Sequence, residues 1–199
     1  MDSQHLALQV LKDQQIELNK DLSFLLGVAV NVELRTDKWH NRTARSLNLA
    51  LTMNHLADCP VDKEQLTAAV LAHDIGMGFL PFKVLNKPGQ LNAKERKTMQ
   101  AHIKSAADLI HRMQGWNDAR DMILCHHERE NGSGYPNQRS ADEICPGAKI
   151  LAIVDAFTAQ GSSNIMHGVM EIHRYTGTHF SESWVQHFDA AVKVIHQST

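Results

Sequence analysis

The chain has 199 residues, 43% of them hydrophobic, and a formal net charge of -2 at pH 7. This composition is typical of a folded soluble protein, and its nearly balanced charge excludes a broad basic surface for a nucleic-acid polymer or an anionic membrane. The three cysteines form no Cys-x-x-Cys pair, the N-terminus has no basic signal-peptide region, and no apolar run could cross a bilayer, so we expect a cytoplasmic protein.

Residues 1–36 are predicted to form an N-terminal helical extension. Residues 4–20 are polar with scattered apolar positions, and 21–36 continue as a more apolar helix, straight or bent. The periodicity is compatible with a packing helix, a dimer helix or the remnant of a linker to a sensor. We therefore expect either a homodimer formed through this helix or regulation by a separate protein.

Residues 37–199 show helical spacing of apolar residues almost throughout and no alternating strand pattern. Asp62 and Asn92 are predicted N-caps, each followed three residues later by Gln or Glu, and Pro146 fits the first turn of a later helix. The predicted helices run from 38 to 57, from Asp62 to Gly76, from Asn92 to Gly115, from 117 to 128, from Pro146 to a break at 161–163, over 165–175, and from Ser181 onward. Residues 76–91 and 131–145 are predicted loops.

Several of these helices carry histidines or carboxylates on their apolar faces. One such histidine is more often a core imidazole with a single partner. A buried carboxylate such as Asp155, however, must be paired, protonated or metal-bound, and no arginine or lysine neighbours it at helical spacing. We interpret the whole set as a shared metal centre made of His40, His73, Asp74, His102, His126, His127 and Asp155.

The ligand types predict the metals. Nitrogen and oxygen ligands without a thiolate suit Fe or Mn first, with Zn and Ni as further candidates. Seven ligands are too many for one catalytic ion that keeps an open position, so we predict two divalent ions bridged by Asp74. Their residual positive charge favours a phosphate ligand.

Three motifs, in this order, then resemble the HD-GYP subset of the HD phosphohydrolase superfamily: His73-Asp74, His126-His127-Glu128-Arg129 and Gly134-Tyr135-Pro136. The similarity runs from about His40 to Val192. It implies an all-α HD-domain helical bundle and a phosphodiesterase that opens cyclic di-GMP to pGpG and sometimes cuts further to GMP.

The resemblance also implies roles for single residues. One ion would be held by His40, His73, Asp74 and Asp155, and the other by Asp74, His102, His126 and His127. A hydroxide between the ions would attack phosphorus. The Gly134, Tyr135 and Pro136 loop would lie beside the substrate, braced by Glu128 and Arg129. We count Asp74, Glu128 and Arg129 as candidate catalytic residues.

Two departures from the family pattern leave more than one function open. Met77 replaces the lysine that contacts the substrate phosphate in the family, a loss of about 1–3 kcal/mol if a charged hydrogen bond disappears, and residues 159–164 lack the family's basic stretch. The chain could therefore be a metal-binding but weakly active signalling domain that acts through protein partners. The same residues are also compatible with a di-iron oxygenase, or with a hydrolase of another nucleotide or hybrid cyclic dinucleotide.

Overall fold

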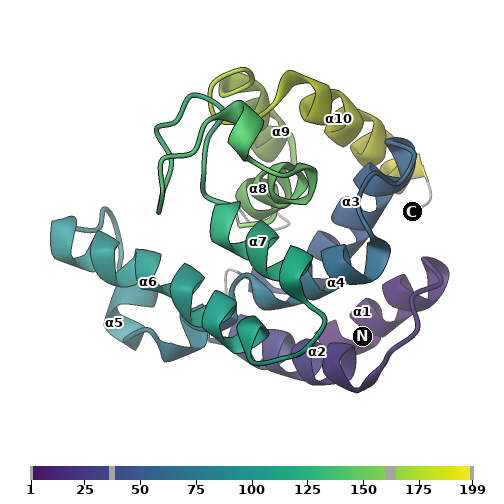
Figure 1. Cartoon of the computed structure of the whole chain (residues 1–199), viewed down its shortest axis with the longest axis horizontal. Helices are drawn as coiled ribbons and strands as arrows, with labels where there is room; N and C mark the ends of the chain where they lie inside the picture. Colours follow the sequence, from purple (N-terminus) through teal and green to yellow (C-terminus); the bar gives the residue numbers. More distant parts are fainter. Residues whose placement is uncertain (1, 36–38, 160–164, 198–199) are drawn as a thin grey trace.

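A computed structural model describes residues 2–35, 39–159 and 165–197. The regular structure of those residues is helical, with two isolated β-bridges and no β-strand, so the predicted all-α fold is confirmed (Figure 1). Within these ranges every helix falls short of the length or the apolar character that a membrane crossing needs.

Most of the helices follow one another with short connections, and the longest described connection is the segment 126–140 between α7 and η3. The N-terminal half contains α1 (Ser3–Asp13), α2 (Lys20–Glu33), α3 (Arg42–Leu56), α4 (Lys63–Ala72), the 3-10 helix η2 (Ile75–Phe79) and α5 (Phe82–Leu85). The C-terminal half contains α6 (Ala93–His111), α7 (Asn117–Cys125), the 3-10 helix η3 (Ala141–Glu143), α8 (Pro146–Thr158), α9 (Ile165–Arg174) and α10 (Glu182–Gln197).

Two of the predicted helix starts, at Asp62 and Asn92, are confirmed by side-chain caps. Asp62 accepts a hydrogen bond from the backbone N–H of Gln65 at 2.9 Å. Asn92 and Glu95 form a reciprocal capping box at the start of α6. Such caps satisfy the backbone N–H groups that have no partner within the helix, and so fix where the helix begins.

Other boundaries differ from the prediction. The helix expected from residue 38 begins at Arg42, because Asn41 has a left-handed backbone with φ of 54°. The segment 76–91 is not a plain loop, since η2 and α5 lie within it. The break expected at 161–163 lies outside the described residues.

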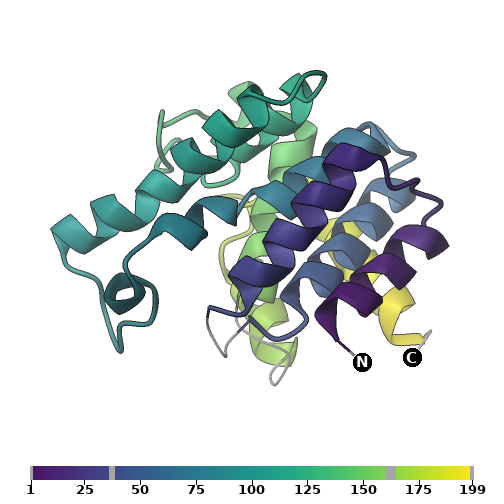
Figure 2. The ribbon, with the colours of Figure 1, turned by 90° about the horizontal axis from the view of Figure 1, so that it is seen from below.

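The helices pack against one another (Figures 1 and 2) around one large hydrophobic core and two small apolar clusters. Helices α3, α4 and α8 contribute fully buried residues such as Leu47, Leu66 and Leu151. Ala7 and Leu11 of α1 are buried in the same core. The N-terminal helices thus share the core of the remaining chain. The domain boundary predicted between 36 and 37 falls at residues outside the described ranges and stays a prediction.

One glycine sets the distance between η2 and α6. A Cβ atom at Gly76 would lie 2.0 Å from the carbonyl oxygen of His102 and 2.7 Å from its Cα atom. Only glycine allows this approach, because a real Cβ essentially never comes so close to backbone atoms. The close contact holds the turn that carries Asp74 against the helix that carries His102.

Candidate metal centre

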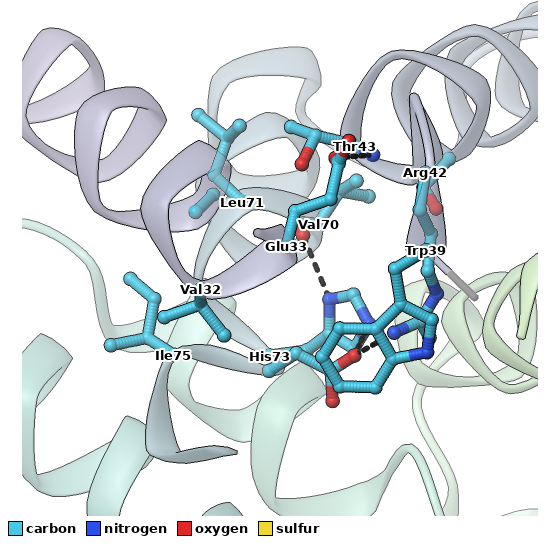
Figure 3. Close-up of a pocket in the computed structure, with 12 residues that line it drawn as sticks. Val32, Glu33, Trp39, Arg42, Thr43, Val70, Leu71, His73 and Ile75 are labelled. Carbon is cyan, nitrogen blue, oxygen red and sulfur yellow. Dashed lines mark hydrogen bonds and ion pairs between the residues drawn. The ribbon is translucent and has the colours of Figure 1, made fainter. Parts of the chain in front are cut away.

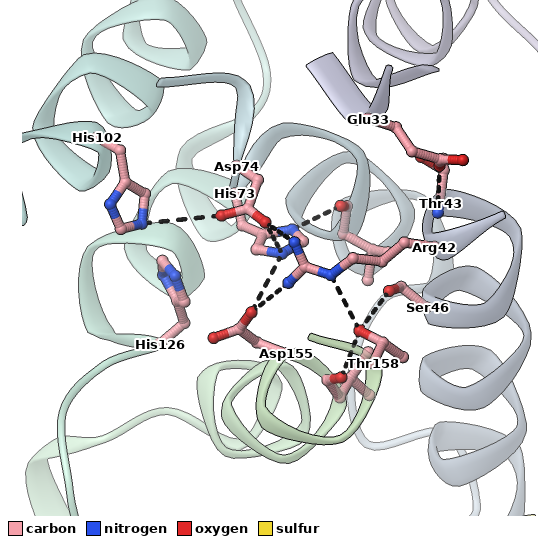
Figure 4. Close-up of polar contacts among 12 residues, drawn as sticks. Glu33, Arg42, Thr43, Ser46, His73, Asp74, His102, His126, Asp155 and Thr158 are labelled. Carbon is pink, nitrogen blue, oxygen red and sulfur yellow. Dashed lines mark hydrogen bonds and ion pairs between the residues drawn. The ribbon is translucent and has the colours of Figure 1, made fainter. Parts of the chain in front are cut away.

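The centre lies where four helices end or pass one another (Figure 4). His73 is the C-cap of α4 and is followed directly by Asp74. His126 is the C-cap of α7 and is followed by His127. The remaining two members come from the middle of α6 and the last turns of α8, and the six residues form two groups of candidate metal ligands: His102, His126 and His127 in one, and His73, Asp74 and Asp155 in the other.

His40 is the one predicted ligand that the structure does not bring to this place. It lies in the turn before α3, it is exposed to solvent, and it belongs to neither ligand group. The backbone geometry gives the reason, because α3 starts only after the left-handed Asn41 and the turn directs His40 outward. A role for His40 in metal binding stays a prediction.

Three histidines are oriented by the same backbone contact. The Nδ1 atoms of His73, His102 and His126 lie 2.7, 2.7 and 2.6 Å from the carbonyl oxygen three residues earlier. A carbonyl oxygen can only accept, so Nδ1 is the donor in each ring and Nε2 is the atom left to face an ion. The three Nε2 atoms are buried and have no hydrogen-bond partner among the described residues. This arrangement is the one that metal-binding histidines adopt in proteins.

The environment keeps the paired histidines neutral. Burial lowers the pKa of His126 well below its ordinary value, and the neighbouring His127 lowers it further. Burial also lowers the pKa of His127 to about 4, although Asp155 acts in the opposite direction. Neutral imidazole is the form that binds metal ions. Both histidines are therefore ready to act as ligands near neutral pH.

The two carboxylates are bridged by an arginine that the sequence analysis did not include. Arg42, at the start of α3, donates from one guanidinium nitrogen to Asp74 Oδ2 and from the other to Asp155 Oδ1. Of the three states left open for Asp155 by the sequence, the structure therefore shows the paired one, and the partner lies far outside helical spacing. Arg42 is 113 residues away in sequence, and helical spacing around Asp155 carries no signal for a contact between α3 and α8.

In each of the two aspartates, one carboxylate oxygen contacts Arg42 and the other faces a histidine of the other ligand group. Asp74 Oδ2 contacts Arg42 and lies 3.3 Å from His73 Nε2, whereas Oδ1 lies 3.9 Å from His102 Nε2. Asp155 Oδ1 contacts Arg42, whereas Oδ2 lies 3.9 Å from His127 Nε2. Both aspartates thus lie between the two groups, the position that a carboxylate shared by two ions would occupy.

The group of His102, His126 and His127 is called the histidine side here, and the group of His73, Asp74 and Asp155 the carboxylate side. The histidine side fits a divalent metal ion. The Nε2 atoms of His102 and His126 are buried and unpartnered, and they lie in one group with an imidazole nitrogen of His127. Burying such polar atoms without a partner costs free energy, which coordination of an ion would recover. On the carboxylate side the ligand types also fit, but Arg42 already contacts both acids.

Arg42 is held in place by its surroundings (Figure 3). Its Nε donates to Thr158 Oγ1 at 3.3 Å, and the ring of Trp39 lies 4.8 Å from the guanidinium carbon. Burial lowers the pKa of Arg42, but Asp74 and Asp155 outweigh it and raise the pKa overall. The guanidinium is therefore a fixed positive charge at the edge of a cavity of about 30 Å³.

A larger pocket of about 340 Å³ opens beside the histidine pair. Tyr135 of the predicted substrate loop stacks on His127, with ring centroids 4.8 Å apart and an interplanar angle of 17°. Tyr175, which also lines the pocket, stacks on His179 with centroids 4.2 Å apart. Arg129 adds a positive charge to the lining. Asp155 and His126 line this pocket too, so a ligand in it would reach the centre.

Glu128 braces the loop that carries Tyr135. Its carboxylate oxygens accept hydrogen bonds from the backbone N–H groups of Asn137 at 2.7 Å and Arg139 at 3.0 Å. Gly134 allows the loop to approach, because a Cβ there would lie 2.4 Å from the Cα of Glu128. Glu128 thus acts on the loop, as the resemblance implied, and the direct catalytic role assigned to it stays a prediction.

Met77 is buried in a small apolar cluster. It packs with Val32 and Leu80, and Trp39 lies against the same cluster. Arg35 fixes this turn by donating to the carbonyl oxygens of Met77 and Leu80 at 2.9 and 3.0 Å. The position that holds a lysine in the family is part of a second hydrophobic core here.

A family model described as HD domain matches residues 29–171. The chain therefore belongs to the HD domain family, which confirms the resemblance to the HD superfamily drawn from the motifs. A 3'3'-cGAMP-specific phosphodiesterase 2 of Vibrio cholerae is 32% identical over 149 residues, which are 73% of this chain and 28% of that protein. A cyclic di-GMP phosphodiesterase of the same organism is 29% identical over 140 residues, which are 67% of this chain and 28% of that protein.

The fold is also that of a solved structure. The crystal structure of a V. cholerae cyclic GMP-AMP phosphodiesterase, V-cGAP3, superposes with a TM-score of 0.67 at 16% sequence identity and covers 86% of this chain and 48% of that chain. At that identity the likeness concerns the fold alone. The chain spans little more than a quarter of the length of the two curated relatives.

Proposed function

We propose that this chain is a metal-dependent phosphodiesterase that hydrolyses a cyclic dinucleotide, cyclic di-GMP or 3'3'-cGAMP, to the linear dinucleotide and onward to mononucleotides. The observation that carries the proposal is a pair of buried Nε2 atoms, those of His102 and His126, that have no hydrogen-bond partner among the described residues and lie beside His127 and two carboxylates. The names of the relatives support the substrate class, since one is called a 3'3'-cGAMP-specific phosphodiesterase and another a cyclic di-GMP phosphodiesterase.

The ions of this enzyme would be two Fe(II) or Mn(II) ions. One would be bound by His102, His126 and His127, and the other by His73, Asp74 and Asp155. Nitrogen and oxygen ligands support these metals, since Cys125 and Cys145 belong to neither group. When bound, the ions supply Lewis-acid chemistry, which activates water and neutralises charge on the phosphate.

The side chains of the pocket suit a nucleotide. Tyr135 and Tyr175 present ring faces on which a base can stack, and Arg129 supplies a charge for phosphate. Burial raises the pKa of Tyr135 to about 12, with Asp155 acting in the same direction, so its hydroxyl stays a hydrogen-bond donor. Asp74 Oδ1 and Asp155 Oδ2 each lie 3.9 Å from an Nε2 atom of the histidine group, so the carboxylates would lie within reach of both ions.

Turnover of cyclic di-GMP and 3'3'-cGAMP tests the proposal. The protein would be purified without oxygen, loaded with Mn(II) or Fe(II), and compared with His102→Ala and with His111→Ala. Both histidines lie on α6, but His111 is exposed and outside the centre. We expect the linear dinucleotide from the wild type and His111→Ala and none from His102→Ala. A metal-loaded wild type that cleaves neither substrate would contradict the proposal.

A weakly active signalling domain is the second candidate. Two residues favour it. Arg42 already contacts the carboxylates that a second ion would need, and Met77, in an apolar cluster, cannot bind a phosphate. Metal binding with normal stability but without turnover would support this candidate.

Regulation through the N-terminal helices is also part of the proposal. Phe24 of α2 is 51% exposed and Leu8 of α1 is 37% exposed, so these helices offer apolar side chains to a second copy or to a regulatory protein. Light scattering on the wild type and Phe24→Ser would test the homodimer.

The three free thiols fit the reducing cytoplasm expected from the sequence.

A further inference from the structure

The guanidinium of Arg42 contacts the carboxylate oxygens that a second metal ion would need as ligands. It contacts Asp74 Oδ2 and Asp155 Oδ1, and His73 Nε2 faces the same two oxygens at 3.3 and 3.9 Å. Asp74 and Asp155 are the only carboxylates in the ligand group that they form with His73, so an ion there would have to bind these same two side chains. A guanidinium and a divalent cation cannot share this space, because like charges at such distances repel strongly.

We propose that Arg42 is a built-in competitor of the second metal ion. The arginine supplies the positive charge that the two buried carboxylates require, and an ion binds on the carboxylate side only after the guanidinium has withdrawn. This inference deepens the proposed function because it concerns the same centre, but it depends on metal binding and not on the substrate.

The surroundings of Arg42 favour the position between the carboxylates. The side chain is 6% exposed, and it would lose two charge-assisted hydrogen bonds and its contact with Trp39 on leaving. Thr158, which accepts from Nε, is itself fixed by a 3.0 Å contact with Ser46 Oγ. The withdrawn state is therefore the minor one. The affinity for an ion that needs this state is reduced by the fraction of molecules that populate it.

The histidine side has no such competitor. The Nε2 atoms of His102 and His126 have no partner among the described residues, so an ion there displaces no side chain. The first ion should bind at this side directly. The second must compete with Arg42, and the two ions should differ in affinity for this reason.

A Mn(II) titration tests the inference. Bound Mn(II) is measured by equilibrium dialysis with metal analysis, and free Mn(II) by its EPR signal, for the wild type, Arg42→Gln and Arg45→Gln. Arg45 is on the same helix and contacts the carbonyl oxygen of Thr158, but neither carboxylate. We expect one tight ion in the wild type and in Arg45→Gln. Arg42→Gln should bind a second ion about tenfold or more tightly than the wild type does.

Two tight ions in the wild type would overturn the inference, as would an unchanged second affinity in Arg42→Gln. The wild-type titration decides the first point even if Arg42→Gln fails to fold. Arg42→Lys gives a second variant, because lysine keeps the charge but cannot fork between two carboxylates, and we expect it to bind the second ion with intermediate affinity. A protein that binds metal as expected but cleaves no cyclic dinucleotide would contradict the proposed function and leave this inference supported.

Discussion

The histidine side and the carboxylate side of the centre differ in how the chain balances their charge. His102 and His126 are buried, and each donates from Nδ1 to a carbonyl oxygen of its own helix while Nε2 has no hydrogen-bond partner among the described residues. Asp74 and Asp155 are half-buried and have a guanidinium between them. The difference follows from desolvation, because a neutral imidazole can be buried at modest cost whereas a charged carboxylate needs a counter-charge.

This comparison explains why one side carries an arginine and the other does not. A pair of carboxylates within reach of each other would repel and shift toward protonation without a cation. Arg42 prevents this, and the pKa of Asp74 stays well below its ordinary value: burial alone would raise it, but Arg42 and His73 outweigh burial. The same residue that stabilises the fold without metal thus opposes metal binding.

The largest effect should come from removing this counter-charge in protein stripped of metal. Arg42→Leu leaves Asp74 and Asp155 buried without a cation, and we expect the free energy of unfolding to fall by ~3–5 kcal/mol. Urea denaturation in EDTA measures it. Arg45→Leu, which removes an arginine from the same helix, should cost clearly less.

A double-mutant cycle sharpens this result. Arg42→Leu and Asp155→Asn in one chain should cost less than the sum of the two single changes, because the asparagine no longer needs the guanidinium. Strict additivity would mean that the pair contributes through packing and not through charge.

The next largest effect concerns the contact that joins the two sides. Gly76→Ala places a methyl group 2.0 Å from the carbonyl oxygen of His102, so η2 must move away from α6 and take Asp74 with it. We expect a loss of ~1–3 kcal/mol in unfolding free energy together with weaker binding of Mn(II). Gly27 in α2 has no atom within 4 Å of an added Cβ. The control Gly27→Ala should therefore raise stability by about 0.5–1 kcal/mol; equal effects of the two changes would contradict this account.

Acid should act on the two sides at different pH values in metal-free protein. Burial lowers the pKa of His126 and takes the pKa of His127 to about 4. The unfolded chain therefore takes up protons that the folded chain does not as the pH falls from about 6.5 toward 4, and stability falls with it. The raised pKa of His73 opposes this in part: burial lowers it, but Asp74 outweighs burial. Because the pKa of Asp74 is lowered in the folded chain, the stability that this carboxylate contributes is lost only below about pH 4.

Urea denaturation in EDTA between about pH 7.5 and 4.5 checks this order. His127→Gln should flatten the decline of stability with acid, and the change of the exposed His111 to Gln should leave the slope as it is. A decline that His127→Gln does not alter would show that other groups control acid stability.

The sequence predicted the helices better than it predicted how their ends meet. Caps such as Asp62 and Asn92 are local, and so is the apolar spacing that predicted the all-α fold. The proximity of His73, His102 and His126, in which the ring centroid of His126 lies 5.5 and 5.7 Å from those of the other two, was also predictable, because polar residues on apolar helix faces signal a shared site.

Arg42 could not be predicted from the same signals. It belongs to α3 and its partners to the end of α4 and to α8, so the contact depends on how three helices pack. His40 shows the same limit, since its exposed position follows from the left-handed Asn41 beside it and not from the spacing of apolar residues. A useful signal was nonetheless present, because two buried carboxylates require a cation from somewhere in the chain.

The smallest expected effect comes from Glu128, and it distinguishes a role in supporting the substrate loop from a role in the metal centre. Glu128 accepts two backbone hydrogen bonds from the loop and lies in neither ligand group. Glu128→Gln keeps the shape but replaces one accepting oxygen by a donor, so we expect a loss of ~1 kcal/mol in stability. Because the loop carries Tyr135 into the pocket, KM for the cyclic dinucleotide should rise while the amount of bound Mn(II) stays the same. If Glu128 instead took part in the reaction, kcat would fall with KM unchanged, and the comparison would then place this carboxylate with Asp74 and Asp155.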